Sequence, residues 1–165
     1  MTKTHKRARL LEILAVEDNP ADIRYISEIF KDGRLANRLT AISDGDSALR
    51  YLRAEGEFSG AVRPDLVLLD LNMPGKNGRK VLEEIRRDPS LSHLPVIILT
   101  TSSAMEDVSF TYDLGADSYM VKPADLSQLI KVAMCLENVG IGLVAAPARK
   151  KKNPRSRGNE RRTND

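Results

Sequence analysis

Short apolar runs alternate with amphipathic stretches along the chain, and the two patterns predict different elements. Five apolar runs predict strands near residues 11–16, 38–43, 65–70, 95–100 and 118–121. Apolar residues at helical spacing predict helices over residues 20–31, 44–52, 78–89, 104–114 and from 125 onward. Residues 55–64 hold two glycines and a proline, which indicate a loop. This alternation predicts an α/β fold in which helices cover both faces of a parallel sheet.

The charge is distributed unevenly, although the net charge is only +3. The first ten residues carry four basic side chains and no acidic one, and residues 147–165 carry eight basic and two acidic side chains. The stretch between them, with 14 basic and 21 acidic side chains, is acidic. We therefore expect a basic N-terminal segment at 1–9, a folded domain at 10–144 and a basic disordered tail at 145–165, which has too few apolar residues to fold.

Several function classes are disfavoured by composition and motif content. The one cysteine excludes an internal disulfide and a multi-cysteine metal site. No apolar run approaches the ~20 residues of a membrane span, so we expect a cytoplasmic protein without a membrane partner. A dinucleotide site is disfavoured because no glycine-rich turn follows the first predicted strand.

Polar residues stand at the carboxyl ends of four predicted strands. The first strand is followed by Glu17 and Asp18, the third ends in Asp70, the fourth ends in Thr100 and the fifth is followed by Lys122. The carboxyl ends of parallel strands share one edge of the sheet, where open α/β folds bind ligands. A strand order of 2-1-3-4-5 would place the first and third strands side by side and would bring the three carboxylates together.

Three carboxylates in one crevice repel one another unless a cation lies between them. Mg²⁺, with Mn²⁺ as the alternative, suits this site because both ions bind oxygen ligands, and the lack of nearby histidine or cysteine argues against zinc. The Lys122 ammonium and the Thr100 hydroxyl are suited to the oxygens of a phosphoryl group. Together these groups indicate phosphoryl transfer to an aspartate.

Each of these residues also has an ordinary structural interpretation. For Asp18, next to Asn19 and Pro20, a turn or helix cap would be the better interpretation if the residue stood alone. Asp70 could form a turn, Lys122 could be a solvated lysine, and Thr100 could be a β-branched strand residue. We favour the functional interpretation because the polar residues coincide at four strand ends.

Four segments resemble the receiver domain of bacterial response regulators. The resemblance covers about residues 10–138 and is specific, because four motifs occur in order at suitable spacings: Val16-Glu-Asp-Asn-Pro-Ala-Asp22, Leu68-Leu-Asp-Leu-Asn-Met-Pro-Gly-Lys-Asn-Gly78, Leu99-Thr-Thr-Ser102 and Val121-Lys-Pro123. The resemblance implies the flavodoxin-like fold with strand order 2-1-3-4-5.

The same resemblance implies a role for the acidic residues. By position, Asp70 matches the phosphoacceptor and also a metal ligand. Asp18 matches the direct metal ligand, and Glu17 matches the acid that usually reaches the metal through water. The main-chain carbonyl of Asn72 matches the third protein ligand of the metal.

A second set of positions matches the residues that respond to phosphorylation. Thr100 matches the switch hydroxyl, Lys122 the phosphate-binding lysine, and Tyr119 the aromatic side chain whose rotamer follows the threonine. An ordinary aromatic residue of an edge strand is the alternative interpretation of Tyr119. Asn72 and Ser102 are expected to tune the access of water and hence the lifetime of the acyl phosphate.

Within the family, the chain is most similar to single-domain regulators that partner bacterial phytochrome histidine kinases. Such regulators tend to carry aromatic residues after the last helix and often pair through that end. Residues 137–144 contain two glycines and no aromatic residue, which leaves a homodimer open. The segments that carry this resemblance are Glu17-Asp-Asn-Pro-Ala-Asp-Ile-Arg24, Glu55-Gly-Glu-Phe58 with Arg63-Pro-Asp65, Thr100-Thr-Ser-Ser103 and Tyr112-Asp-Leu-Gly-Ala116.

We therefore expect a single-domain response regulator that accepts a phosphoryl group on Asp70 from a sensor histidine kinase and signals to a partner through a change of conformation. It is expected to be a signalling protein and not an enzyme, since it catalyses only its own phosphorylation and dephosphorylation. The sequence does not identify the downstream target.

Two other classes fit the sequence less well. An aspartyl-phosphate phosphatase resembles DxDx[TV] at its nucleophile, and Asp70-Leu-Asn-Met-Pro74 lacks the second aspartate. A binding module could signal without phosphorylation or bind nucleic acid through the basic tail. An intact set of site residues disfavours the former, and the lack of an aromatic or folded reader beside the tail disfavours the latter.

Overall fold

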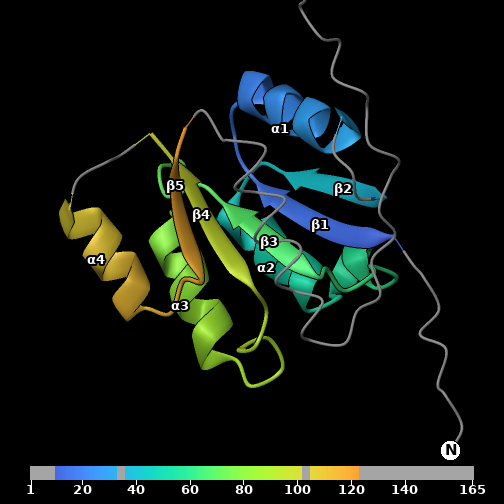
Figure 1. Ribbon diagram of the computed structural model, residues 1–165. Coiled ribbons are helices and arrows are strands. Elements are labelled where there is room, and N and C mark those ends of the chain that lie inside the picture. The colour runs from blue at the N-terminus through green and yellow to red at the C-terminus, as the bar shows by residue number, and fades with distance from the viewer. Residues whose placement is uncertain (1–9, 33–35, 102–104, 123–165) are drawn as a thin grey trace, which may run out of the picture.

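A five-stranded parallel sheet forms the centre of the protein (Figure 1). The computed structural model describes residues 10–32, 36–101 and 105–122. The sheet order is β2-β1-β3-β4-β5, and every neighbouring pair is parallel. This confirms the predicted α/β flavodoxin-like architecture. The strands are β1 (Leu11–Val16), β2 (Asn37–Ile42), β3 (Leu66–Leu69), β4 (Val96–Thr100) and β5 (Ser118–Val121).

Helices cover both faces of this sheet (Figure 1). Helix α1 (Pro20–Asp32) packs on one face, while α2 (Gly45–Leu52) and α3 (Gly78–Arg87) pack on the other. Helix α4 (Met105–Asp113) lies beside the edge strand β5. The helix predicted from residue 125 and the segments predicted at 1–9 and 145–165 lie outside the described residues.

The apolar strands feed two hydrophobic cores because side chains alternate between the faces of a strand. In β1, Leu14 and Val16 face the core under α2 and α3, whereas Ile13 and Ala15 face the core under α1. Strands β3 and β4 divide their side chains in the same way, and all of these residues are at most 2% exposed. Burial on both faces explains why the central strands read as continuous apolar runs.

One prediction about the connections was wrong. Residues 55–64 were expected to be a loop, but they contain the 3₁₀ helix η1 (Gly56–Phe58). The Phe58 ring contacts the Tyr51 ring edge-on, with 5.5 Å between the ring centroids. This packing on α2 stabilises a short helix that two glycines made hard to predict.

Side-chain caps make the helices begin close to the carboxyl edge of the sheet. Asp44 accepts a hydrogen bond from the main-chain nitrogen of Ser47 (2.8 Å) at the start of α2. Asn77 caps α3 in the same way. These contacts satisfy donors that a helix leaves unpaired and fix the direction in which the chain leaves the edge. Among the described residues, no helix is long and apolar enough to cross a membrane.

Candidate functional site

Main-chain hydrogen bonds continue the sheet one residue past the strands and hold the predicted site residues. The main-chain nitrogen of Glu17 donates to the carbonyl of the last residue of β2, and that of Asp70 donates to the carbonyl of the last residue of β1, each over 3.0 Å. The nitrogen of Lys122 donates to the carbonyl of Thr100, the last residue of β4, over 2.8 Å. The carboxyl edge of the sheet therefore places these side chains in one region, as the strand pattern predicted.

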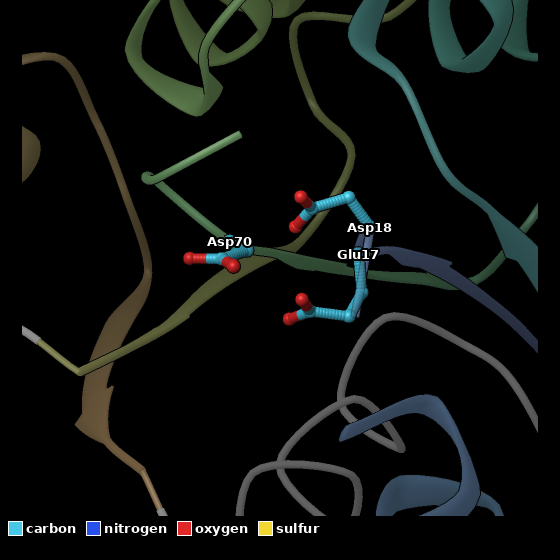
Figure 2. A group of neighbouring side chains, drawn as sticks. All are labelled: Glu17, Asp18 and Asp70. Carbon is cyan, nitrogen blue, oxygen red and sulfur yellow. The ribbon is translucent and has the colours of Figure 1, made fainter. Parts of the chain in front are cut away.

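The three predicted acidic residues form a compact group (Figure 2). Figure 2 shows the carboxylates of Glu17 and Asp18 at the end of β1 and that of Asp70 at the end of β3, all projecting toward the same side. One oxygen from each carboxylate lies within 4.8 Å of the others. Glu17 and Asp70 are buried and Asp18 is half-buried. This set of hard oxygen donors fits a divalent cation such as Mg²⁺ or Mn²⁺.

The ammonium group of Lys122 contacts three carboxylates. Its Nζ atom lies 2.5 Å from Oε2 of Glu17, 2.8 Å from Oδ2 of Asp22 and 3.2 Å from Oδ2 of Asp70. The Lys122 side chain is only 11% exposed. The alternative of a solvated lysine is therefore wrong, and Lys122 stands beside the predicted acceptor.

Burial and charge change the acid–base properties of this cluster. Burial raises the pKa of Glu17 from 4.5 to about 7, although hydrogen bonds from Lys122 and the Asn19 nitrogen lower it in part. Burial by itself lowers the pKa of Lys122. The hydrogen bonds to Asp22 and Glu17 and the nearby carboxylate charges together raise this pKa by more than burial lowers it, so the net shift is upward. Lys122 thus stays charged at neutral pH, while Glu17 is poised to exchange a proton.

Asp70 makes a turn contact and faces the site at the same time. Its Oδ1 atom accepts a hydrogen bond from the main-chain nitrogen of Asn72 (3.0 Å), which fixes the carboxylate plane. Its Oδ2 atom is the oxygen near Lys122. The turn interpretation and the functional interpretation are therefore compatible, because each uses a different oxygen.

Thr100 is fully buried and is held by a second contact from Asn72. The side-chain Nδ2 of Asn72 donates to Oγ1 of Thr100 over 3.1 Å. Because the hydroxyl oxygen accepts this bond, its own proton is free to be donated elsewhere. Tyr119 on β5 is half-buried and packs against the core under α2 and α3, as an edge-strand aromatic residue would. Ser102 lies outside the described residues.

Residues 13–134 match the family model described as the response regulator receiver domain. The chain belongs to this receiver domain family. This receiver domain is 40% identical to the response regulator Rcp1 of Synechocystis sp. over 136 residues, which cover 82% of this chain and 92% of Rcp1. The family predicted from the sequence motifs is confirmed.

Solved structures agree with this assignment. The receiver domain is similar to the phosphorylated cyanobacterial phytochrome response regulator RcpA, with 45% identity, a TM-score of 0.68, and coverage of 79% of this chain and 93% of that chain. It is also similar to the Mn²⁺-bound form of Rcp1, with 39% identity, a TM-score of 0.66, and coverage of 83% and 99%. The predicted similarity to regulators of phytochrome signalling is thereby confirmed.

Two features of the receiver site were not predicted from the sequence. Asp22, in the first turn of α1, joins the site through Lys122, and the sequence showed it only as part of a motif. The second is the cap of α1, which was the alternative interpretation of Asp18: it is supplied by Asn19, whose Oδ1 accepts a hydrogen bond from the nitrogen of Ala21 (2.9 Å). An acid in the first turn of the helix that follows the first strand was the available signal for Asp22, since this turn begins at the same sheet edge.

Proposed function

We propose that Asp70 accepts a phosphoryl group from the phosphohistidine of a sensor histidine kinase. The proposal is based on the surroundings of Asp70. Its carboxylate is buried at the sheet edge and grouped with those of Glu17 and Asp18. The Oδ2 atom of Asp70 lies 3.2 Å from the Lys122 ammonium. In the transfer, Oδ2 forms a bond to phosphorus while the bond from phosphorus to the histidine nitrogen breaks. The imidazole leaves with that electron pair and then takes up a proton.

Glu17, Asp18 and Asp70 would hold Mg²⁺ or Mn²⁺, with the Asn72 carbonyl as a further ligand and Glu17 acting through water. The Mn²⁺-bound form of the relative Rcp1 supports this proposal. When bound, the cation supplies positive charge to the oxygens of the transferring phosphoryl group. Lys122 donates a hydrogen bond to another of these oxygens, and Thr100 donates its hydroxyl proton to a third.

The contacts of Thr100 provide a route from the phosphoryl group to the surface. A phosphoryl oxygen that recruits the Thr100 hydroxyl draws β4 and its neighbours toward Asp70, and Tyr119 on the adjacent strand turns inward. Phosphorylation thus shifts the population between two conformations, because only one of them makes these contacts. Asn72 and Ser102 tune the access of water to phosphorus, which sets the rate at which the domain dephosphorylates itself.

The kinase partner that fits best is a bacterial phytochrome, because RcpA, which is 45% identical to this chain where the two align, is a cyanobacterial phytochrome response regulator. A homodimer and a downstream protein target are the further predicted partners. The cytoplasm stays the predicted compartment, and the domain boundaries at residues 10 and 144 stay predictions.

Intact mass after incubation with acetyl phosphate and Mg²⁺ tests this function. We expect wild type to gain the mass of one HPO₃ group, and we expect EDTA or the substitution Asp70→Asn to abolish the gain. Asp113→Asn, at an exposed aspartate of α4, is the matched control and should be phosphorylated as wild type is. A gain that persists in Asp70→Asn would show that another residue is the acceptor.

A further inference from the structure

The three carboxylates around Lys122 are not equivalent. Glu17 and Asp70 belong to the acidic group that fits a divalent cation, and both are buried. Asp22 stands outside that group, on the first turn of α1, with a side chain that is 35% exposed. Its Oδ2 atom nevertheless lies 2.8 Å from the Lys122 Nζ, closer than the Asp70 oxygen at 3.2 Å.

A divalent cation and Lys122 would compete for the same two carboxylates, those of Glu17 and Asp70. The lysine contacts Oε2 of Glu17 and Oδ2 of Asp70, and these carboxylates are two of the three that can surround a cation. A cation between them repels the ammonium and weakens its bonds to both. Among the described residues, Asp22 is then the carboxylate contact of the Lys122 ammonium that does not belong to the acidic group.

We propose that Asp22 is a positioning residue that retains the Lys122 ammonium beside Asp70 when the acidic group holds a divalent cation. This inference rests on the proposed roles of Asp70 and Lys122. An ammonium has three donors, so Lys122 can keep its bond to Asp22 and still donate to an incoming phosphoryl oxygen. Without Asp22, the lysine either stays on Glu17 and Asp70 and opposes the cation or leaves toward solvent.

An acid in the first turn of a helix also has a purely structural use, because it interacts favourably with the helix dipole. That role stabilises α1 but does not involve Lys122. The two roles are separated by a measurement on the lysine itself and by a cycle of substitutions at both positions.

The first test observes the Lys122 ammonium by ¹⁵N–¹H NMR, where a buried, hydrogen-bonded ammonium exchanges its protons slowly. The signal is assigned by its loss in Lys122→Met. We expect it to persist in wild type with saturating Mg²⁺ and to disappear in Asp22→Asn with Mg²⁺. Asp22→Glu, which restores a carboxylate, should recover it, and Glu28→Gln, at an exposed acid of α1, should leave it unchanged. A signal that persists in Mg²⁺-loaded Asp22→Asn overturns the inference.

The second test measures Mg²⁺ affinity by titration of wild type, Asp22→Asn, Lys122→Met and the double variant. We expect Asp22→Asn to weaken Mg²⁺ binding about fivefold in wild type, as for the loss of one partly exposed ion pair, and to have a clearly smaller effect in Lys122→Met. Equal effects in the two backgrounds overturn the inference while leaving the proposed function intact. Wild type that binds no Mg²⁺ overturns both.

Discussion

At the scale of single residues, the carboxyl group of Glu17 is buried and also contacts the ammonium group of Lys122. Its side chain is 3% exposed and lies 2.5 Å from the Lys122 Nζ. Burial raises its pKa from 4.5 to about 7, so the cost of desolvation outweighs the contact with Lys122. A divalent cation that binds beside Glu17 favours the ionised carboxylate. Below pH 7, cation binding should therefore release the proton of Glu17.

This pKa predicts how stability depends on pH in the metal-free protein. Between pH 4.5 and about 7, folded Glu17 holds a proton that the unfolded chain has released. The free energy of unfolding should therefore fall as pH rises through this window, by on the order of 2–3 kcal/mol. Urea unfolding in EDTA, compared between wild type and Glu17→Gln, isolates this contribution. A fall of the same size in Glu17→Gln would contradict the assignment.

At the scale of elements, Gly78 joins α3 to the end of β3. A Cβ atom at this position would lie 2.1 Å from the carbonyl oxygen of Asp70 and 2.8 Å from the Cα of Leu71. The Gly78 nitrogen also donates to the Leu71 carbonyl over 3.2 Å. The helix can approach the proposed acceptor this closely only because residue 78 has no side chain.

Gly78→Ala should therefore lower the free energy of unfolding by about 1–3 kcal/mol, since backbone atoms must move to make room. The control is Gly60→Ala, because a Cβ there would meet no atom within 4 Å. Its effect should stay within about 0.5 kcal/mol. Urea midpoints of the two variants compare these effects directly, and equal stabilities would show that the contact at Gly78 is relieved without cost.

Arg86 ties α3 to two loops on the opposite edge of the sheet. Its guanidinium donates to the carbonyls of Ser92 (2.9 Å), Leu94 (2.6 Å) and Gly115 (2.8 Å) and to the Asp117 carboxylate (3.0 Å). The planar group reaches all four acceptors at once, which the single ammonium of a lysine does not reproduce. The arginine therefore orients the chain entering β4 and β5.

Arg86→Lys should lower the free energy of unfolding by about 1.5–3 kcal/mol, because several main-chain acceptors lose a charged donor. Arg87→Lys is the matched control, since that side chain is 77% exposed and its ion pair is with Glu83, one turn earlier on the same helix. Its effect should stay near zero. Thermal melts of the two variants provide the comparison, and similar melting temperatures would argue against the role of Arg86.

At the scale of the whole molecule, the strands and the acidic group could be predicted because their signals are local. Each central strand is an apolar run, and Glu17, Asp70 and Thr100 are the polar residues at the carboxyl ends of these runs. The contact between Asp22 and Lys122 was missed because Asp22 stands in the first turn of a helix and not at the end of an apolar run, and β5 is not adjacent to β1. Only the packed structure shows that Lys122, after β5, contacts both Glu17 at the end of β1 and Asp22 at the start of α1.

Arg86 was missed for a related reason. In the sequence it is one of two adjacent arginines at the end of a helix, a pattern typical of solvated charge. Three of its acceptors are carbonyl oxygens, which no residue type reveals. Contacts with main-chain atoms therefore cannot be predicted from a sequence pattern, even where they connect several elements.

In the proposed function, the phosphoryl group resides on Asp70. Reduction of the phosphorylated protein with borohydride converts an aspartyl phosphate to homoserine, and peptide mass spectrometry then locates that residue. We expect homoserine at position 70, only after incubation with acetyl phosphate and Mg²⁺. Homoserine at position 18, a reduced glutamyl product at position 17, or a phosphorylated protein without any reduced residue would contradict it.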